Sequence, residues 1–438
     1  MNLYFPKLLP VAIIFILFQS LGISHVIAQQ NDPTFIIGDA LPDAPELSSR
    51  GEYKVGVRTL DFINKNQADI LHSKEGIDPL YDRPLEVEIW YPAIVPEGKK
   101  ELVTYDATLG IFKDSLRPLI PFTFTGRALR NAEPDMSAGK FPLLIVSHGY
   151  PGSKLLLTYL TENLASKGYV VVAIAHTEST YSDKAGFQST LLNRSKDILF
   201  VLNQIAELSK INSKNFLAGL ADANNTGLIG YSMGGYGVLN AAGAGYSEKL
   251  ATTFSQMTGG SKAINIRTTS NPVFKASYDS RIKAVVAFAP WGKQRGVWDA
   301  EGLQGLKVPT FFVAGSLDDV SGYENGIKAI YTEAVNADRY LLTYVNARHN
   351  VAPNPPPPAS LKVGVAFDEY YHYAEPSWNE YRINNINQHF ITAFIGTYLK
   401  QKDYKKYLDL PEHSNQKTWT GFKERSSTGL ELLHATAK

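Results

Sequence analysis

The chain has 438 residues, of which 44% are hydrophobic, enough to build a full core. Its 43 basic and 42 acidic residues nearly cancel, which excludes an electrostatic surface of the kind that binds nucleic acid or an anionic membrane. The lack of cysteine excludes disulfides, thiolate metal sites and a cysteine nucleophile.

The N-terminus carries the pattern of a secretory signal peptide. Lys7 precedes an apolar run over residues 8–18, which is too short to span a bilayer comfortably. The residues before Gln29 suit cleavage after Ala28. We therefore predict a signal peptide over residues 1–28 and a secreted or periplasmic protein with no stable membrane insertion after cleavage. An uncleaved N-terminal anchor is the alternative.

The next segment indicates a linker followed by a single domain. Residues 29–50 include a stretch rich in Pro, Asp and Ser, which predicts a flexible linker, and the domain is expected over residues 51–438. Residues 55–62 and 85–91 alternate apolar and polar side chains. This alternation is typical of antiparallel strands at a sheet edge with one face buried.

From residue 141 onward, near-continuous apolar runs are separated by segments of helical length. Such runs are typical of parallel strands that are buried on both faces. We predict these strands at residues 141–147, 169–175, 226–230, 282–288, 308–314 and 340–345. Helices are expected at residues 153–166, 194–208, directly after Ser232, at 323–335 and at 386–399. The predicted fold class is α/β, with a mostly parallel central sheet, antiparallel N-terminal strands and helices on both faces.

Two stretches interrupt this alternation, near residues 247–278 and 353–382. In open α/β sheets the ligand crevice lies outside the carboxyl ends of the strands. We therefore expect both insertions to form lid-like walls of a binding pocket.

The segment Gly230-Tyr231-Ser232-Met233-Gly234 has the pattern of a nucleophile elbow. A serine at the tip of a strand-to-helix turn needs a strained backbone, and flanking glycines remove Cβ atoms that would clash. The strand before the motif and the small-residue helix after it supply the context that this geometry requires. Ser232 is therefore the candidate nucleophile.

A serine nucleophile needs a base, and the base needs an orienting carboxylate, in the chain order Ser, acid, His for this architecture. Asp318 lies in the loop after strand 308–314, with Asp319 as its alternative, and His349 lies in the loop after strand 340–345. We predict Asp318 and His349 as the acid and the base.

An oxyanion hole needs two backbone N–H groups. Met233 supplies one at the start of its helix, and Tyr150, in the loop after the first parallel strand, is expected to supply the other. Gly149 is expected to let this loop turn, and His148 is expected to shape the loop by hydrogen bonding.

No metal or cofactor site is expected. His176, His372 and His389 stand apart in the sequence without an acidic cluster, and no nucleotide-type glycine loop follows a strand.

The chain resembles the dienelactone hydrolase-like branch of the α/β-hydrolases, and within it the secreted bacterial platelet-activating factor acetylhydrolase-like esterases. The segments that carry this resemblance are Glu86–Pro92, Val146–Tyr150, Ala165–Val172, Gly230–Gly234 and Asn346–His349. The resemblance implies Ser232, Asp318 and His349 as the catalytic triad, and Tyr150 and Met233 as the oxyanion donors.

A more local resemblance is to bacterial cutinases and poly(ethylene terephthalate) hydrolases. It rests on the Gly149-Tyr150 loop, the Gly-x-Ser-Met-Gly elbow and the segment Ala289-Pro290-Trp291. It implies that Tyr150 and Trp291 bind the acyl group. The chain departs from these enzymes in its greater length, its insertions and its lack of a disulfide.

These patterns predict a secreted serine hydrolase that cleaves small or polymeric carboxylic esters through an acyl-enzyme. Hydrolysis of a polyester or cutin-like polymer is the alternative within this class. A non-catalytic binding protein with the same fold is the alternative from another class.

Overall fold

The computed structural model describes residue 1 and residues 35–438, with the exception of residue 417. Residues 2–28 of the predicted signal peptide and residues 29–34 of the predicted linker lie outside the described residues. Among the described residues, no helix combines the length and the apolar character that crossing a membrane requires.

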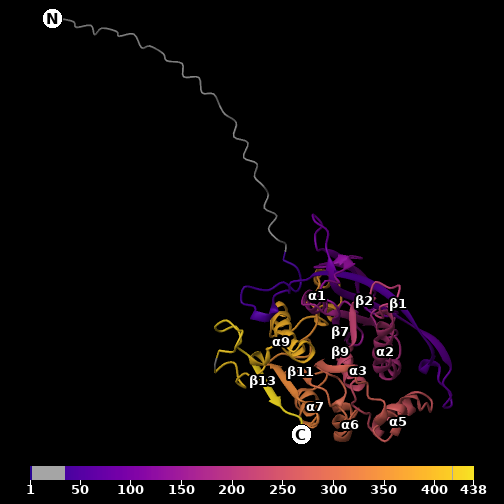
Figure 1. The fold of residues 1–438 in the computed structure, drawn as a ribbon. Helices are drawn as coiled ribbons and strands as arrows, with labels where there is room; N and C mark the ends of the chain where they lie inside the picture. The colour runs from indigo at the N-terminus through magenta and orange to yellow at the C-terminus, as the bar shows by residue number, and fades with distance from the viewer. Residues whose placement is uncertain (2–34, 417) are drawn as a thin grey trace. The chain divides into compact units, whose positions relative to one another are not determined.

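The core of the fold is a mostly parallel, twisted sheet with antiparallel strands at both ends, as Figure 1 shows in part. The strand order is β13-β12-β11-β10-β9-β7-β8-β2-β1-β5, and β6 pairs with β2. The six strands from β8 to β12 in this order are parallel to one another, while β2 and β13 run antiparallel to their neighbours. The mostly parallel sheet that the sequence predicts is confirmed.

The observed strands are β1 Lys54–Ala68, β2 Leu80–Ile94, β3 Val103–Leu109, β4 Ile120–Gly126, β5 Leu129–Arg130, β6 Glu133–Pro134, β7 Phe141–Ser147, β8 Val170–Ala175, β9 Ala221–Tyr231, β10 Ile282–Phe288, β11 Thr310–Gly315, β12 Arg339–Tyr344 and β13 Leu430–Ala435. The predicted parallel strands correspond to β7 through β12. The sequence did not predict the β3–β4 hairpin or the edge strand β13.

The observed α-helices are α1 Thr158–Ser166, α2 Phe187–Leu208, α3 Met233–Ala241, α4 Glu248–Met257, α5 Pro272–Ala276, α6 Ala300–Gln304, α7 Ala329–Glu333, α8 Phe367–Tyr371 and α9 Glu380–Lys400. In Figure 1, α9 and α2 lie on opposite sides of β7 and β9. Hydrogen bonds join α9 to α1, from Asn387 to the Tyr159 hydroxyl (3.0 Å), and α3 to α2, from the Tyr236 hydroxyl to the Leu191 carbonyl (2.7 Å). The sheet is thus covered on both faces.

The order of the strands fixes where a ligand can bind. The chain passes from β7 outward to β8 and then returns to β9 on the other side of β7. This reversal makes the carboxyl ends of β7 and β9 the topological switch point, where open α/β sheets bind their ligands. The loops that begin at His148 and at Ser232 start from these two ends.

Part of the segment predicted as a flexible linker is docked on the domain. The compact unit begins at Ile36 rather than at residue 51. Within residues 36–50, the Leu47 N–H donates to His389 Nδ1 (3.1 Å), and the Asp39 carboxylate pairs with Arg127. These contacts are made with residues distant in the chain, so the local Pro, Asp and Ser content could not predict them.

Candidate active site

Ser232 lies in a sharp turn between β9 and α3, with φ 54° and ψ −113°. The chain crosses itself closely here: a Cβ on Gly230 would lie 2.2 Å from the Gly234 carbonyl oxygen. A Cβ on Gly234 would lie 1.9 Å from the Ser147 carbonyl oxygen at the end of β7. Since only glycine fits at both positions, the Gly-x-Ser-x-Gly spacing is a steric requirement of this turn.

His349 connects Ser232 to Asp318. Its Nε2 lies 3.0 Å from Ser232 Oγ, and its Nδ1 lies 2.9 Å from Asp318 Oδ2. The three residues follow β9, β11 and β12 and are buried, with 5 to 8% of their surface exposed. The carboxyl ends of three parallel strands therefore bring together the serine, the imidazole and the carboxylate that the sequence singled out.

The two adjacent aspartates have different partners. Asp318 Oδ1 accepts hydrogen bonds from the backbone N–H groups of Val320 (2.9 Å) and Ser321 (2.8 Å). Burial acts to raise the pKa of Asp318, but His349 and these N–H donors outweigh it and lower that pKa below its ordinary value. Asp319 instead forms an exposed ion pair with Arg348. The geometry thus favours Asp318 over Asp319 as the partner of His349.

Two backbone N–H groups beside Ser232 have no acceptor among the described residues, those of Tyr150 and Met233. They come from the loop after β7 and from the first residue of α3. Gly149 does not have a positive φ, and a Cβ there would lie an ordinary 3.4 Å from the Tyr231 ring. The loop therefore turns without needing the conformational freedom of glycine at residue 149, which differs from our expectation.

The pocket that contains Ser232 has a volume of about 340 Å³, which is enough for a small ester. The lining of the 340 Å³ pocket consists of Arg117, Gly149, Tyr150, Tyr231, Ser232, Asp319, Val320, His349, Asn350, Asp368, Tyr371 and His372. Tyr150 belongs to this lining and Trp291 does not. Trp291 packs instead against Phe187 (ring centroids 5.2 Å apart) and Tyr236 (6.3 Å).

Sequence reasoning assigned no individual role in this pocket to His372 or to Arg117. His372 donates from Nε2 to the Pro151 carbonyl (3.2 Å), and burial, with the nearby Arg117 cation, lowers the pKa of His372 to about 4. Arg117 lies between β3 and β4 and donates from Nε to Glu369 Oε1 (2.7 Å). Nothing in the sequence before residue 140 indicates that this turn reaches the pocket.

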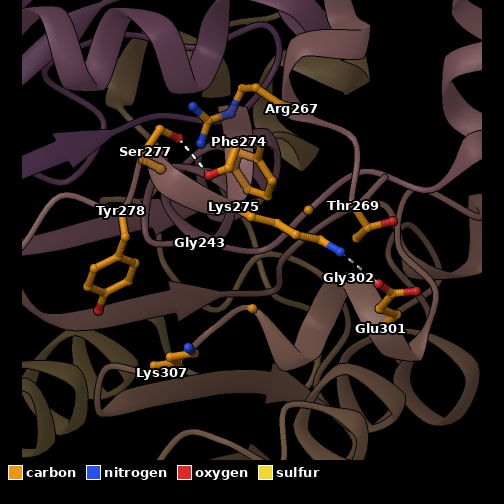
Figure 2. Close-up of a pocket in the computed structure, with 13 residues that line it drawn as sticks. Gly243, Arg267, Thr269, Phe274, Lys275, Ser277, Tyr278, Glu301, Gly302 and Lys307 are labelled. Atoms are coloured by element: carbon orange, nitrogen blue, oxygen red, sulfur yellow. Dashed lines mark hydrogen bonds and ion pairs between the residues drawn. The ribbon is translucent and has the colours of Figure 1, made fainter. Parts of the chain in front are cut away.

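The two insertions have different locations. Asp368, Tyr371 and His372, from insertion 353–382, line the pocket with Ser232. Insertion 247–278 contributes nothing to that lining. It instead lines part of the 410 Å³ pocket shown in Figure 2, where Lys275 faces Glu301 (3.6 Å). Because it joins the C-terminus of α3 to the N-terminus of β10, it follows the end of a helix that leads away from Ser232. The expectation that both insertions wall one pocket is therefore wrong for residues 247–278.

No group of three or more potential metal ligands occurs in the part of the chain that the structure describes. His176 and His389 are each engaged separately, His176 with Asp197 (3.0 Å) and His389 with the Leu47 N–H.

Comparison with known proteins finds similarity to enzymes that are described as ester hydrolases. Residues 131–259 match a family described as PET hydrolase-like. A cutinase from Thermobifida alba is 23% identical over 212 residues, which cover 48% of this chain and 54% of the cutinase. The chain thus spans about half the length of that relative. A ferulic acid esterase from Streptomyces cinnamoneus superposes with a TM-score of 0.52 at 18% identity, covering 82% of this chain and 94% of the esterase.

These similarities cover both the fold and the segment around Ser232. The structural neighbour supports the fold over most of the chain, and the PET hydrolase-like match includes the loop after β7 and the Ser232 turn. The protein therefore has the α/β-hydrolase fold, and parts of its sequence are similar to a cutinase and to the PET hydrolase-like family.

Proposed function

We propose that this protein is an exported serine hydrolase that cleaves carboxylic esters through an acyl-enzyme intermediate. The observation that carries the proposal is the pair of distances at His349, 3.0 Å to Ser232 Oγ and 2.9 Å to Asp318 Oδ2. A serine is a weak nucleophile unless a base accepts its proton, and a carboxylate beside that base stabilises the imidazolium that results.

In the proposed reaction, Ser232 Oγ attacks the carbonyl carbon of the ester while His349 Nε2 accepts the serine proton. The N–H groups of Tyr150 and Met233 donate to the oxyanion of the tetrahedral intermediate. His349 then gives its proton to the departing alcohol, and the acyl group remains on Ser232. A water molecule then attacks the acyl carbon while His349 Nε2 accepts its proton. His349 returns this proton to Ser232 Oγ as the bond between Oγ and the acyl carbon breaks, which releases the carboxylic acid and free Ser232.

The substrate side of the proposal rests on the relatives and on the pocket. One relative is a cutinase, and the matched family is PET hydrolase-like. The pocket at Ser232 has a volume of about 340 Å³, and the Tyr150 ring in its lining offers an apolar contact for an acyl chain.

A panel of chromogenic esters of graded acyl length tests this proposal, with wild-type protein compared with Ser232→Ala. We expect hydrolysis by the wild type and a loss on the order of a millionfold in the variant, at unchanged melting temperature. Activity that survives in folded Ser232→Ala would refute the mechanism. A wild type that hydrolyses no ester would favour a non-catalytic binding protein.

A second candidate substrate is a polyester or cutin-like polymer, which the PET hydrolase-like match over residues 131–259 favours. Release of soluble acids from a polyester film by wild type, but not by Ser232→Ala, would support it. Hydrolysis confined to soluble esters would contradict it.

Export is proposed from the predicted signal peptide over residues 1–28. N-terminal sequencing of protein secreted from a bacterial host is expected to begin at Gln29. A first residue of Met1 in a membrane fraction would indicate the uncleaved anchor.

A further inference from the structure

A fully buried arginine lies beneath the loop after β7. Arg194, in the second turn of α2, is 1% exposed, and no carboxylate forms an ion pair with it in the described part of the chain. The nearest acid on its helix, Asp197, is engaged instead by Arg83, with two hydrogen bonds of 2.9 Å. A buried guanidinium without a carboxylate partner must donate its hydrogen bonds to other acceptors, because an unsatisfied buried charge is costly.

Those acceptors are backbone carbonyls of the loop that carries Tyr150. Arg194 Nη1 donates to the His148 carbonyl, and Arg194 Nη2 donates to the Gly149 carbonyl at 3.2 Å. Arg194 Nη2 also donates to the Ser179 hydroxyl oxygen. The neighbouring helix α3 has a glycine, Gly237, where Arg194 passes. A Cβ on Gly237 would lie 2.3 Å from Arg194 Cγ, so a larger residue there would clash with the arginine.

A second donor reaches the same carbonyl. His148 Nδ1 lies 2.7 Å from the Gly149 carbonyl oxygen, while His148 Nε2 accepts the backbone N–H of His176 at 3.2 Å. With Nε2 acting as the acceptor, the proton of a neutral ring is on Nδ1. Burial, reinforced by the charge of Arg194, keeps the pKa of His148 well below its ordinary value, so the ring is neutral.

The Gly149 carbonyl belongs to the same peptide unit as the Tyr150 N–H. This peptide is trans, so its C=O and N–H point in opposite directions, and fixing the oxygen also fixes the direction of the N–H. Donors on the carbonyl oxygen also polarise the amide, which makes its N–H a stronger donor.

We propose that Arg194 and His148 are positioning residues that orient and polarise the Gly149–Tyr150 peptide as an oxyanion donor. This inference rests on the proposed ester hydrolysis. The effect acts on the negative charge that develops in the tetrahedral intermediate, so it concerns turnover rather than substrate binding.

The test compares Arg194→Met with a matched control, Arg339→Met. Arg339, the first residue of β12, is also buried and also holds backbone carbonyls, those of Tyr331 (2.6 Å) and Ala337 (3.2 Å). It lies at the amino end of its strand, whereas Ser232 and His349 follow the carboxyl ends of theirs. If both buried arginines contribute only to stability, Arg194→Met and Arg339→Met should therefore have similar effects on activity.

We expect Arg194→Met to lower kcat on a chromogenic acetate ester by about ten- to a hundredfold with KM nearly unchanged, since losing an entire oxyanion donor costs about a hundred- to a thousandfold. Affinity for an alkyl boronic acid, which forms a tetrahedral adduct with a nucleophilic serine, should fall by a similar factor. Arg339→Met should keep wild-type kcat and boronate affinity. Arg194→Lys should lie between wild type and Arg194→Met, because one ammonium cannot reproduce the rigid fork of a guanidinium.

Circular dichroism and melting temperature establish that each variant is folded, and Arg194→Lys decides the test if Arg194→Met does not fold. Wild-type kcat in the folded Arg194 variant, an equal loss in Arg339→Met, or a loss confined to KM would overturn the inference and leave ester hydrolysis intact. A wild type without esterase activity would overturn both the proposed function and this inference.

Discussion

The substitution Asp318→Asn should nearly abolish turnover, because the hydrogen bonds made by the Asp318 carboxylate determine how an asparagine would be oriented at this position. Asp318 Oδ1 accepts two backbone N–H groups, and Oδ2 faces His349 Nδ1 at 2.9 Å. An asparagine would place its carbonyl oxygen toward the two N–H donors and its amide NH₂ toward His349. The Nδ1 atom would then have to accept, the ring proton would move to Nε2, and Nε2 could no longer take the proton of Ser232.

The expected loss follows from this change of tautomer. Asparagine at the acid position of a serine triad costs about ten-thousandfold in kcat, or about 5.4 kcal/mol at about 1.36 kcal/mol per tenfold change. Asp319→Asn is the matched control on the adjacent residue. Asp319 also lines the pocket, but its substitution leaves the contact between Asp318 and His349 in place and removes an ion pair with Arg348. The Asp319 and Arg348 side chains are 41% and 44% exposed, and such pairs contribute about 0 to 1 kcal/mol to stability. Its kcat should therefore remain close to that of the wild type.

The assay is kcat on one chromogenic acetate ester at neutral pH, with melting temperatures to establish that both variants fold. The reasoning would be refuted if Asp319→Asn lost more activity than Asp318→Asn, or if Asp318→Asn kept turnover within about tenfold of wild type.

Three further predictions follow from burial and close approach. Gly234→Ala should lower the melting temperature and the activity, because its Cβ would meet the Ser147 carbonyl at 1.9 Å, whereas Gly149→Ala should be tolerated; equal losses in thermal melts and ester assays would contradict this. Burial raises the pKa of Glu162 from 4.5 to about 7, so the folded state holds this proton more tightly than the unfolded chain, and the free energy of unfolding should fall as pH rises through that interval. Urea titrations between pH 4.5 and 8 should show a smaller fall in Glu162→Gln, and identical pH profiles would disprove it. Tyr150→Ala should reduce kcat/KM for long or aromatic acyl esters more than for acetate esters. This reduction should also exceed that of Trp291→Ala, because of the two residues only Tyr150 lines the pocket. The opposite ranking would restore Trp291 as an acyl-binding residue.

The parallel strands could be predicted from sequence because burial on both faces leaves a contiguous apolar signal. Residues 282–288 illustrate this: β10 has the same bounds, and six of its seven residues are buried. Strand β13 was not predicted because only one of its faces is buried, and its short alternating sequence resembles many loops. The β3–β4 hairpin was missed although apolar and polar residues alternate in both strands, with Asp106 and Thr123 among the polar ones, so the signal was present in the sequence.

The candidate site separates what local sequence predicts from what only the fold decides. Chain order and strand ends were enough to select Ser232 and His349. The choice between Asp318 and Asp319 depends on which carboxylate turns inward, and adjacent residues in a loop do not encode that direction in their sequence. Arg194 and Arg117 were not selected at all, since their partners lie 45 and 252 residues away in the chain.

The structure also shows how the strained backbone of Ser232 is held in place. A positive φ at a non-glycine residue costs on the order of 1 to 3 kcal/mol, so surrounding contacts must offset it. The Ser232 N–H donates to the Phe288 carbonyl at 2.9 Å, and the Ser232 carbonyl accepts the N–H groups of Tyr236 (3.0 Å) and Trp291 (3.2 Å). At about 0.5 to 1.5 kcal/mol each, these three hydrogen bonds are of the size needed. Trp291 therefore supports the elbow through its backbone, and a change of its side chain leaves that hydrogen bond available.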